Sequence, residues 1–177
     1  MDKIMKMNKQ LLALGATLAL ASQAGSVAMA AQEDGSAVAV VIAPLIVTEN
    51  TAMDFGTVAG GANADTIVLT TAGARTATGT DAQVIGAGGA AGNFTVSGEA
   101  GSSYVVTFSA SATLSDGGGN TMTVNNFTDN NPSPIDGGGS DTLLVGGTLN
   151  IGANQAAGNY STANGGGAPY TVTVNYN

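Results

Sequence analysis

The sequence contains no cysteine, no histidine and no tryptophan, and it has only four phenylalanines and four tyrosines. Without cysteine no disulfide can stabilise the fold. Without cysteine and histidine, the usual nucleophile–base pairs and most transition-metal sites are excluded. Paired carboxylates of the glycosidase type remain, but such acids lie in clefts usually lined with aromatic rings, and most aromatic residues here fall on predicted core faces. We therefore expect no enzymatic activity and no cofactor.

Positive charge is also scarce, and most of it lies at the start of the chain. Lys3, Lys6 and Lys9 precede an apolar run at Leu11–Ala21, which is followed by the small-x-small triplet Ala28-Met29-Ala30. This order is typical of a cleavable export signal, and the apolar run is too short for a comfortable membrane span. We expect a signal peptide at residues 1–30, with an uncleaved anchor as the alternative. The protein would then be exported, passing through the periplasm to the cell surface or the medium.

After cleavage the chain would keep eleven acidic residues and a single cation, Arg75, a net charge of about −10. Such a surface repels phosphate, which argues against nucleic-acid binding and against docking on anionic lipid. Arg75 lies in the turn-rich segment 72–79. We expect its fork of donors to fix a turn, a structural role, with recognition of a carboxylate ligand as the alternative.

Helical periodicity is almost absent after the signal, and short alternating runs are separated by clusters of Gly, Asn and Asp. Residues 142–151 are predicted to form either one strand bent at Gly146-Gly147 or a hairpin. Residues 125–141 are predicted to form a long surface loop, and residues 153–158 could hold one helical turn. The pattern predicts an all-β, immunoglobulin-like antiparallel β-sandwich over residues 45–177. The expected strands are 37–47, 53–58, 66–71, 94–97, 104–110, 121–127, 142–151 and 170–176.

The two most strand-like segments lie at the two ends of the mature chain. In the last one, a single face carries Tyr170, Val172, Val174 and Tyr176. In the first, Val38, Val40 and Ile42 share a face, and Pro44 interrupts the run. Residues 31–44 therefore form either an N-terminal extension that donates a strand to a neighbouring subunit or a strand that pairs within its own domain.

Four aspartates in or beside flexible loops raise the question of a calcium site, because hard oxygen ligands suit Ca²⁺. No spacing matches an EF-hand, so we expect solvated turn residues. The weak candidates for metal ligands are Asp116, Asp129, Asp136 and Asp141. A surface adhesin or glycan-binding module, with or without calcium, is the alternative function that such a site would favour.

Several segments together resemble a family of exported bacterial proteins known as domain of unknown function 4402. They include residues 43–47, 53–58, 73–79, 120–127 and 171–176. That family is similar to spore coat protein U and to chaperone–usher pilins. Those proteins share a Gly-x-Tyr segment, here at Gly158 and Tyr160, and a last strand with a penultimate tyrosine, here Tyr176.

The resemblance implies that a periplasmic chaperone, and then a neighbouring subunit, engages the last strand. This chain departs from the better-known pilins in having Asn164 where they carry a glycine, and in lacking their disulfide. The function expected is that of a secreted structural subunit of a fimbria-like or coat-like surface assembly, joined by donor-strand complementation. Its partners would be other copies or related subunits, a periplasmic chaperone and an outer-membrane usher.

Overall fold

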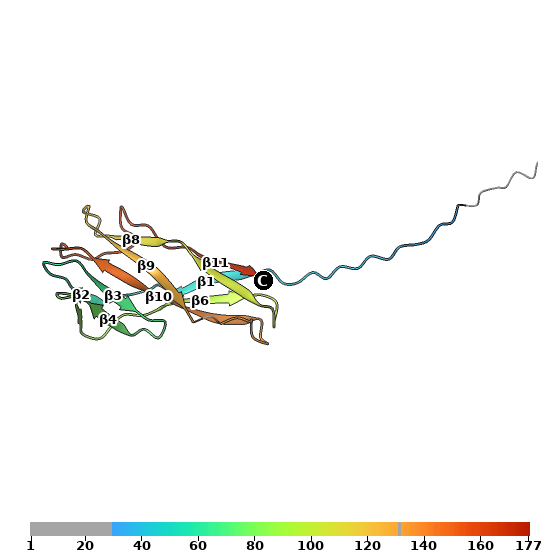
Figure 1. The fold of residues 1–177 in the computed structure, drawn as a ribbon, viewed down its shortest axis with the longest axis horizontal. Coiled ribbons are helices and arrows are strands. Elements are labelled where there is room, and N and C mark those ends of the chain that lie inside the picture. Colours follow the sequence, from blue (N-terminus) through green and yellow to red (C-terminus); the bar gives the residue numbers. More distant parts are fainter. Residues whose placement is uncertain (1–29, 131) are drawn as a thin grey trace, which may run out of the picture. The chain divides into compact units, whose positions relative to one another are not determined.

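The computed structural model describes residues 30–130 and 132–177, so the predicted signal peptide lies outside the described residues except for Ala30. Residues 40–177 form the compact domain, and the residues before them are a separate unit. The described part is built from strands without any helix, which confirms the predicted all-β class (Figure 1). In this part of the chain no helix has the length and apolar character needed to span a membrane.

The described residues form eleven strands that pair in antiparallel fashion, and the longest of them, β10, organises the domain. The main sheet has the order β1-β6-β10-β3-β4, with β9 paired to β10 and β8 paired to β9. Two smaller ladders join β11 to β7 and β2 to β5. The bounds are β1 Ile46–Thr51, β2 Thr57–Ala59, β3 Asp65–Leu69, β4 Arg75–Thr78, β5 Gln83–Ile85, β6 Gly92–Ser97, β7 Tyr104–Phe108, β8 Ser111–Ser115, β9 Thr121–Asp129, β10 Ser140–Ile151 and β11 Val172–Tyr176.

Strand β10 runs without a break through Gly146-Gly147, so residues 142–151 are one strand and the hairpin alternative is wrong. Its first half pairs with β6, from Ser140 to Val145, and its second half pairs with β3, from Gly147 to Ile151. At Gly146 a Cβ atom would overlap the carbonyl oxygen of Leu69. Glycine is therefore needed where this strand passes closest to its neighbour.

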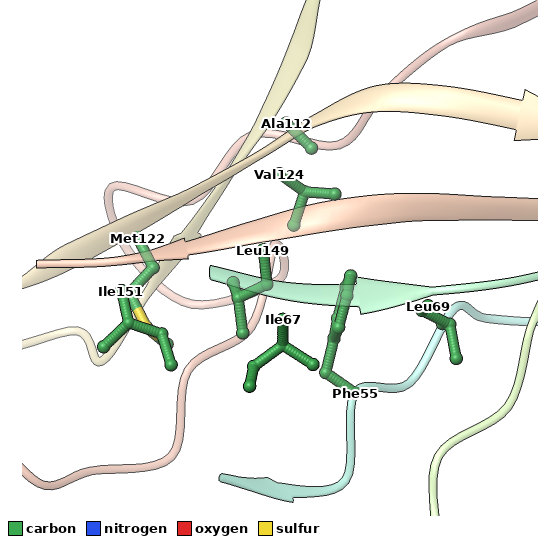
Figure 2. Packing of buried hydrophobic residues seen from close by; sticks show 8 residues of the cluster. All are labelled: Phe55, Ile67, Leu69, Ala112, Met122, Val124, Leu149 and Ile151. Carbon is green, nitrogen blue, oxygen red and sulfur yellow. The ribbon is translucent and has the colours of Figure 1, made fainter. Parts of the chain in front are cut away.

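The core consists of two apolar clusters, and β10 contributes to both. Leu143 and Val145 belong to one cluster, with Phe94, Val96 and Ile135. Leu149 and Ile151 belong to the other, together with residues of β3, β8 and β9 (Figure 2). Period-2 alternation thus places every second side chain of β10 in the interior, as expected for a strand with one buried face.

Three expectations from the sequence are wrong in detail. The segment 125–141 is not one long loop, because β9 extends to Asp129 and β10 begins at Ser140. The remaining connection contains Ile135, which is 1% exposed and packs in the core. No helical turn forms at 153–158. Strands β4, β5 and β8 were not expected, since their sequences are short and rich in Thr, Ser and Gln.

A buried carboxylate closes the connection between β4 and β5. Asp65, at the start of β3, is 7% exposed and accepts hydrogen bonds from the backbone N–H groups of Thr80, Asp81 and Ala82 at 3.2, 2.7 and 2.7 Å. These bonds, the one from Asp81 first, lower the pKa of Asp65, because they stabilise the charged form. At Gly79, which has a φ of +124°, a Cβ atom would overlap this carboxylate. The connection between β4 and β5 therefore requires both the carboxylate of Asp65 and a glycine at position 79, which leaves room for that carboxylate.

Candidate functional site

The sandwich has an opening between its first and its last strand. Among the described residues β1 pairs with β6 alone, and β11 pairs with β7 alone. The two strands approach each other but form no ladder. Each therefore keeps one edge whose N–H and C=O groups have no strand partner, and such an edge is a template for pairing with another chain.

A cavity of about 1040 Å³ lies at this opening. Val47 and Glu49 of β1 line one side, and Tyr170 and Val172 line the other. Among the other residues that line it are apolar side chains of β8, β9 and β10, and most of these are drawn in Figure 2. They are Ala112, Leu114, Met122, Val124, Leu149 and Ile151.

The cavity is open to solvent, so it is not a void in a finished core. Its lining is polar and apolar in about equal measure, and most of the apolar side chains from β8, β9 and β10 are themselves nearly fully buried. An open cavity of this kind can hold water, and the strand edges beside it also suit another segment of polypeptide.

Tyr170 forms one wall of the cavity and carries an unused hydrogen-bond donor. Its ring stacks on Phe127 at a centroid distance of 4.7 Å and meets Phe94 edge-on at 6.2 Å. Its buried hydroxyl makes no hydrogen bond within the described residues. Burial, and then the nearby charge of Glu49, raise the pKa of Tyr170 to about 12. The phenol is therefore protonated at neutral pH and could donate to a carbonyl of an added strand.

The residues predicted to donate a strand are exposed. We call residues 36–42 the arm. Val38, Val40, Val41 and Ile42 are 98%, 89%, 94% and 46% exposed. A strand was expected from residue 37, but β1 begins only at Ile46. Pro44 has no N–H to donate, and in the described part of the chain residues 36–42 belong to no strand ladder. Single exposed apolar residues are ordinary, but a contiguous run marks an interaction site.

The point where the arm joins the domain is held by two side chains. The backbone N–H of Ala43 donates to Oε2 of Glu99 at 3.2 Å. The hydroxyl of Tyr176 donates to the carbonyl oxygen of Ala43 at 2.7 Å and accepts from the backbone N–H of Glu99 at 2.7 Å. We call this arrangement of Ala43, Glu99 and Tyr176 the clamp. Both backbone polar groups of Ala43 are therefore engaged with other parts of the domain.

The predicted last strand alternates as the sequence indicates. Strand β11 begins at Val172, so Tyr170 precedes it in the connection from β10. Tyr170, Val172, Val174 and Tyr176 are half-buried and pack against the core cluster that contains Phe94 and Leu143. The residues between them are exposed. The role of Tyr176 in the clamp was not apparent from the sequence, because its partners are 77 and 133 positions away.

Arg75 holds another part of the cavity lining in place. Its guanidinium donates to the carbonyl oxygens of Phe55 at 2.7 Å, Thr57 at 3.4 Å and Gly86 at 3.0 Å. Phe55 and Thr57 line the cavity. The planar fork of arginine thus ties the segment after β1 to the turn after β5, a task that the single charge of lysine would perform less well.

The four aspartates considered as metal ligands do not form one group in the described structure, although Asp136 and Asp141 are in contact. Asp116 accepts from the backbone N–H of Gly118 and from both the side chain and the backbone of Asn120, and the side-chain bond is the main cause that lowers its pKa. Asp136 accepts from Gly138, and its own N–H donates to Asp141. Asp129 is the last residue of β9. Within residues 30–130 and 132–177, no three acidic, histidine or cysteine side chains gather into a possible metal site.

Comparison with known protein families places the chain in a family. A family model described as "Domain of unknown function (DUF4402)" matches residues 45–176, which include all eleven strands. This confirms the resemblance to that family inferred from the sequence. The match does not extend to spore coat protein U or to pilins, so that likeness stays a prediction. Neither a curated protein nor a solved structure matches the chain.

Proposed function

We propose that this chain, which belongs to the DUF4402 family, is a secreted structural subunit of a fimbria-like or coat-like surface assembly. The arm of one copy is added as a strand between β1 and β11 of the next copy. One observation carries the proposal: the described chain presents both an exposed apolar segment and an open cavity, partly lined by apolar side chains and bordered by two strand edges that are unpaired among the described residues. The cavity can bury the apolar side chains of the segment, and the segment can pair with the free strand edges that border the cavity.

Strand addition would use both the backbone and the side chains of the arm. The free edges of β1 and β11 offer main-chain hydrogen bonds, and alternate side chains enter apolar pockets. Val38, Val40 and Ile42 share one face of an extended strand, and burying a Val or Ile side chain contributes about 1.5–3 kcal/mol. Seven residues at about 3.3 Å each span roughly 23 Å, which is comparable to the six residues of β1.

The two interacting surfaces are different parts of the molecule, so the contact between copies is head-to-tail. A contact of this kind leaves one arm and one cavity free at the two ends of any multimer, and it continues unless the rotation closes a ring. The proposed product is therefore an open filament or layer rather than a closed dimer.

Export and delivery complete the proposal. A signal peptide at residues 1–30 would bring the chain out of the cytoplasm. A periplasmic chaperone would then cover the open cavity by adding a strand of its own, and an outer-membrane usher would exchange that strand for the arm of the next subunit. The role of the protein is structural in this account, and it requires no catalytic group.

Light scattering on a concentration series of the chain beginning at Ala31 tests the proposed function. We expect the mean mass to rise continuously with concentration, and negative-stain electron microscopy of the concentrated sample to show filaments or layers. A stable monomer at high concentration would contradict the proposal. So would an oligomer of one fixed size, because it would mean that the contact closes on itself.

A further inference from the structure

We infer that the clamp directs the arm into the cavity of a second copy. It does so because the clamp prevents a chain from inserting its arm into the cavity of the same molecule. This inference rests on the proposed function and names the partner that the cavity accepts. A chain that carries both an apolar arm and an open cavity could in principle fill its own cavity, and the result would be a closed monomer. The clamp acts against that outcome.

Self-insertion requires the chain to reverse direction between the arm and β1. Since β1 begins at Ile46 and borders the opening, the reversal must occur within Ala43-Pro44-Leu45. Tight hairpins favour turns with positive φ, which glycine and asparagine adopt readily, and these three residues include neither. Pro44 also fixes its own φ near −65° and keeps Ala43 extended.

The hydrogen bonds of the clamp strengthen this local preference. The N–H of Ala43 is engaged by Glu99, from the connection between β6 and β7, and its carbonyl by Tyr176 of β11. Reversing the chain at residue 43 would break both bonds and leave the Tyr176 hydroxyl without its acceptor. Insertion of an arm from a second copy leaves the clamp of each molecule intact. The clamp therefore disfavours only the closed monomer.

The absence of cysteine from the sequence provides a clean background for a cross-linking test. We would place one cysteine in the arm, Val40→Cys, and one in the cavity, Leu114→Cys, in the chain beginning at Ala31. With the clamp intact, oxidation is expected to join different chains and to give a ladder of multimers on a non-reducing gel. With Tyr176→Phe added, we expect the ratio of within-chain to between-chain disulfides to rise roughly tenfold, the factor that corresponds to about 1.4 kcal/mol.

Tyr104→Phe is the matched control for the loss of the hydroxyl. Tyr104 lies opposite Tyr176 in the β7–β11 ladder, and its buried hydroxyl has no hydrogen-bond partner in the described structure. Its removal should leave the cross-linking ratio unchanged. Glu99→Ala provides a second test that does not alter β11, and it should shift the ratio in the same direction as Tyr176→Phe. Glu99→Gln retains an acceptor oxygen and should keep the ratio of the parent.

The possible results separate the clamp from strand addition itself. An unchanged ratio in both Tyr176→Phe and Glu99→Ala would overturn the inference and leave the proposed function standing. Within-chain disulfides as the main product of the parent would also overturn it, since the arm would then fill its own cavity. A parent that forms no disulfide at all would contradict strand addition, and the inference would fail with it.

Discussion

A chain that begins at Ala43 is expected to remain a monomer at concentrations at which the chain beginning at Ala31 forms multimers. The truncation removes Val38, Val40, Val41 and Ile42, which are exposed in the single chain, so it should leave the core unchanged. Burial of three of these side chains in a neighbour would contribute several kcal/mol, at about 1.5–3 kcal/mol each. We therefore expect a complete loss of assembly with little change in the stability of the domain.

Light scattering after size-exclusion chromatography measures this loss, and circular dichroism verifies that the truncated domain is folded. The truncation ends before Ala43, so the clamp residues are retained. Multimers of the truncated chain with the same masses as those of the longer chain would show that another surface joins the subunits, and that the arm is dispensable.

The second large effect is expected from a single charge placed on one face of the arm. Val40→Asp puts a carboxylate on the face shared with Val38 and Ile42, which would enter the cavity. Burying an unpaired charge opposes insertion by several kcal/mol, so we expect assembly to weaken about a hundredfold or more. Val41→Asp places the same charge on the opposite face, where water remains accessible, and its effect should be small.

These two variants form a matched pair. Val40 and Val41 are 89% and 94% exposed in the single chain, and both substitutions introduce the same negative charge. Neither substitution should change the thermal stability of the monomer. The midpoint concentration of assembly, measured by light scattering, distinguishes them. Equal weakening by both variants would indicate general electrostatic repulsion between acidic subunits and would argue against insertion of one face of the arm.

The sequence predicts those strands in which apolar and polar residues alternate, because the alternation matches the burial of every second side chain. In β10 the buried side chains of Leu143, Val145, Leu149 and Ile151 alternate with glycine or half-buried residues, and in β11 half-buried side chains alternate with exposed ones. The apolar alternation behind this pattern is visible in the sequence. Strand β4, with the sequence RTAT, and strand β8, with the sequence SATLS, carry no such apolar pattern. They form because their backbones pair with strands brought close by the rest of the fold, which local sequence does not encode.

In the candidate site too, the features formed by neighbouring residues could be predicted from the sequence, and the features formed by distant residues could not. The arm was predicted from the sequence, as a donor strand or as a strand paired within its own domain, since Val38, Val40 and Ile42 alternate along a short stretch of chain. The opening could not be found in this way, because it depends on β1 and β11 lying close together without pairing, although they are separated by most of the chain. The clamp likewise joins Ala43 to residues 56 and 133 positions away.

Mixing two complementary variants tests the central claim most directly. The chain beginning at Ala43 keeps the cavity but has no arm, and Leu114→Arg in the chain beginning at Ala31 keeps the arm but places a charge in the cavity. Each should be a monomer alone, and native mass spectrometry of the equimolar mixture should show a complex of one copy of each, with no larger species. Two variants that stay separate when mixed would contradict strand addition between copies.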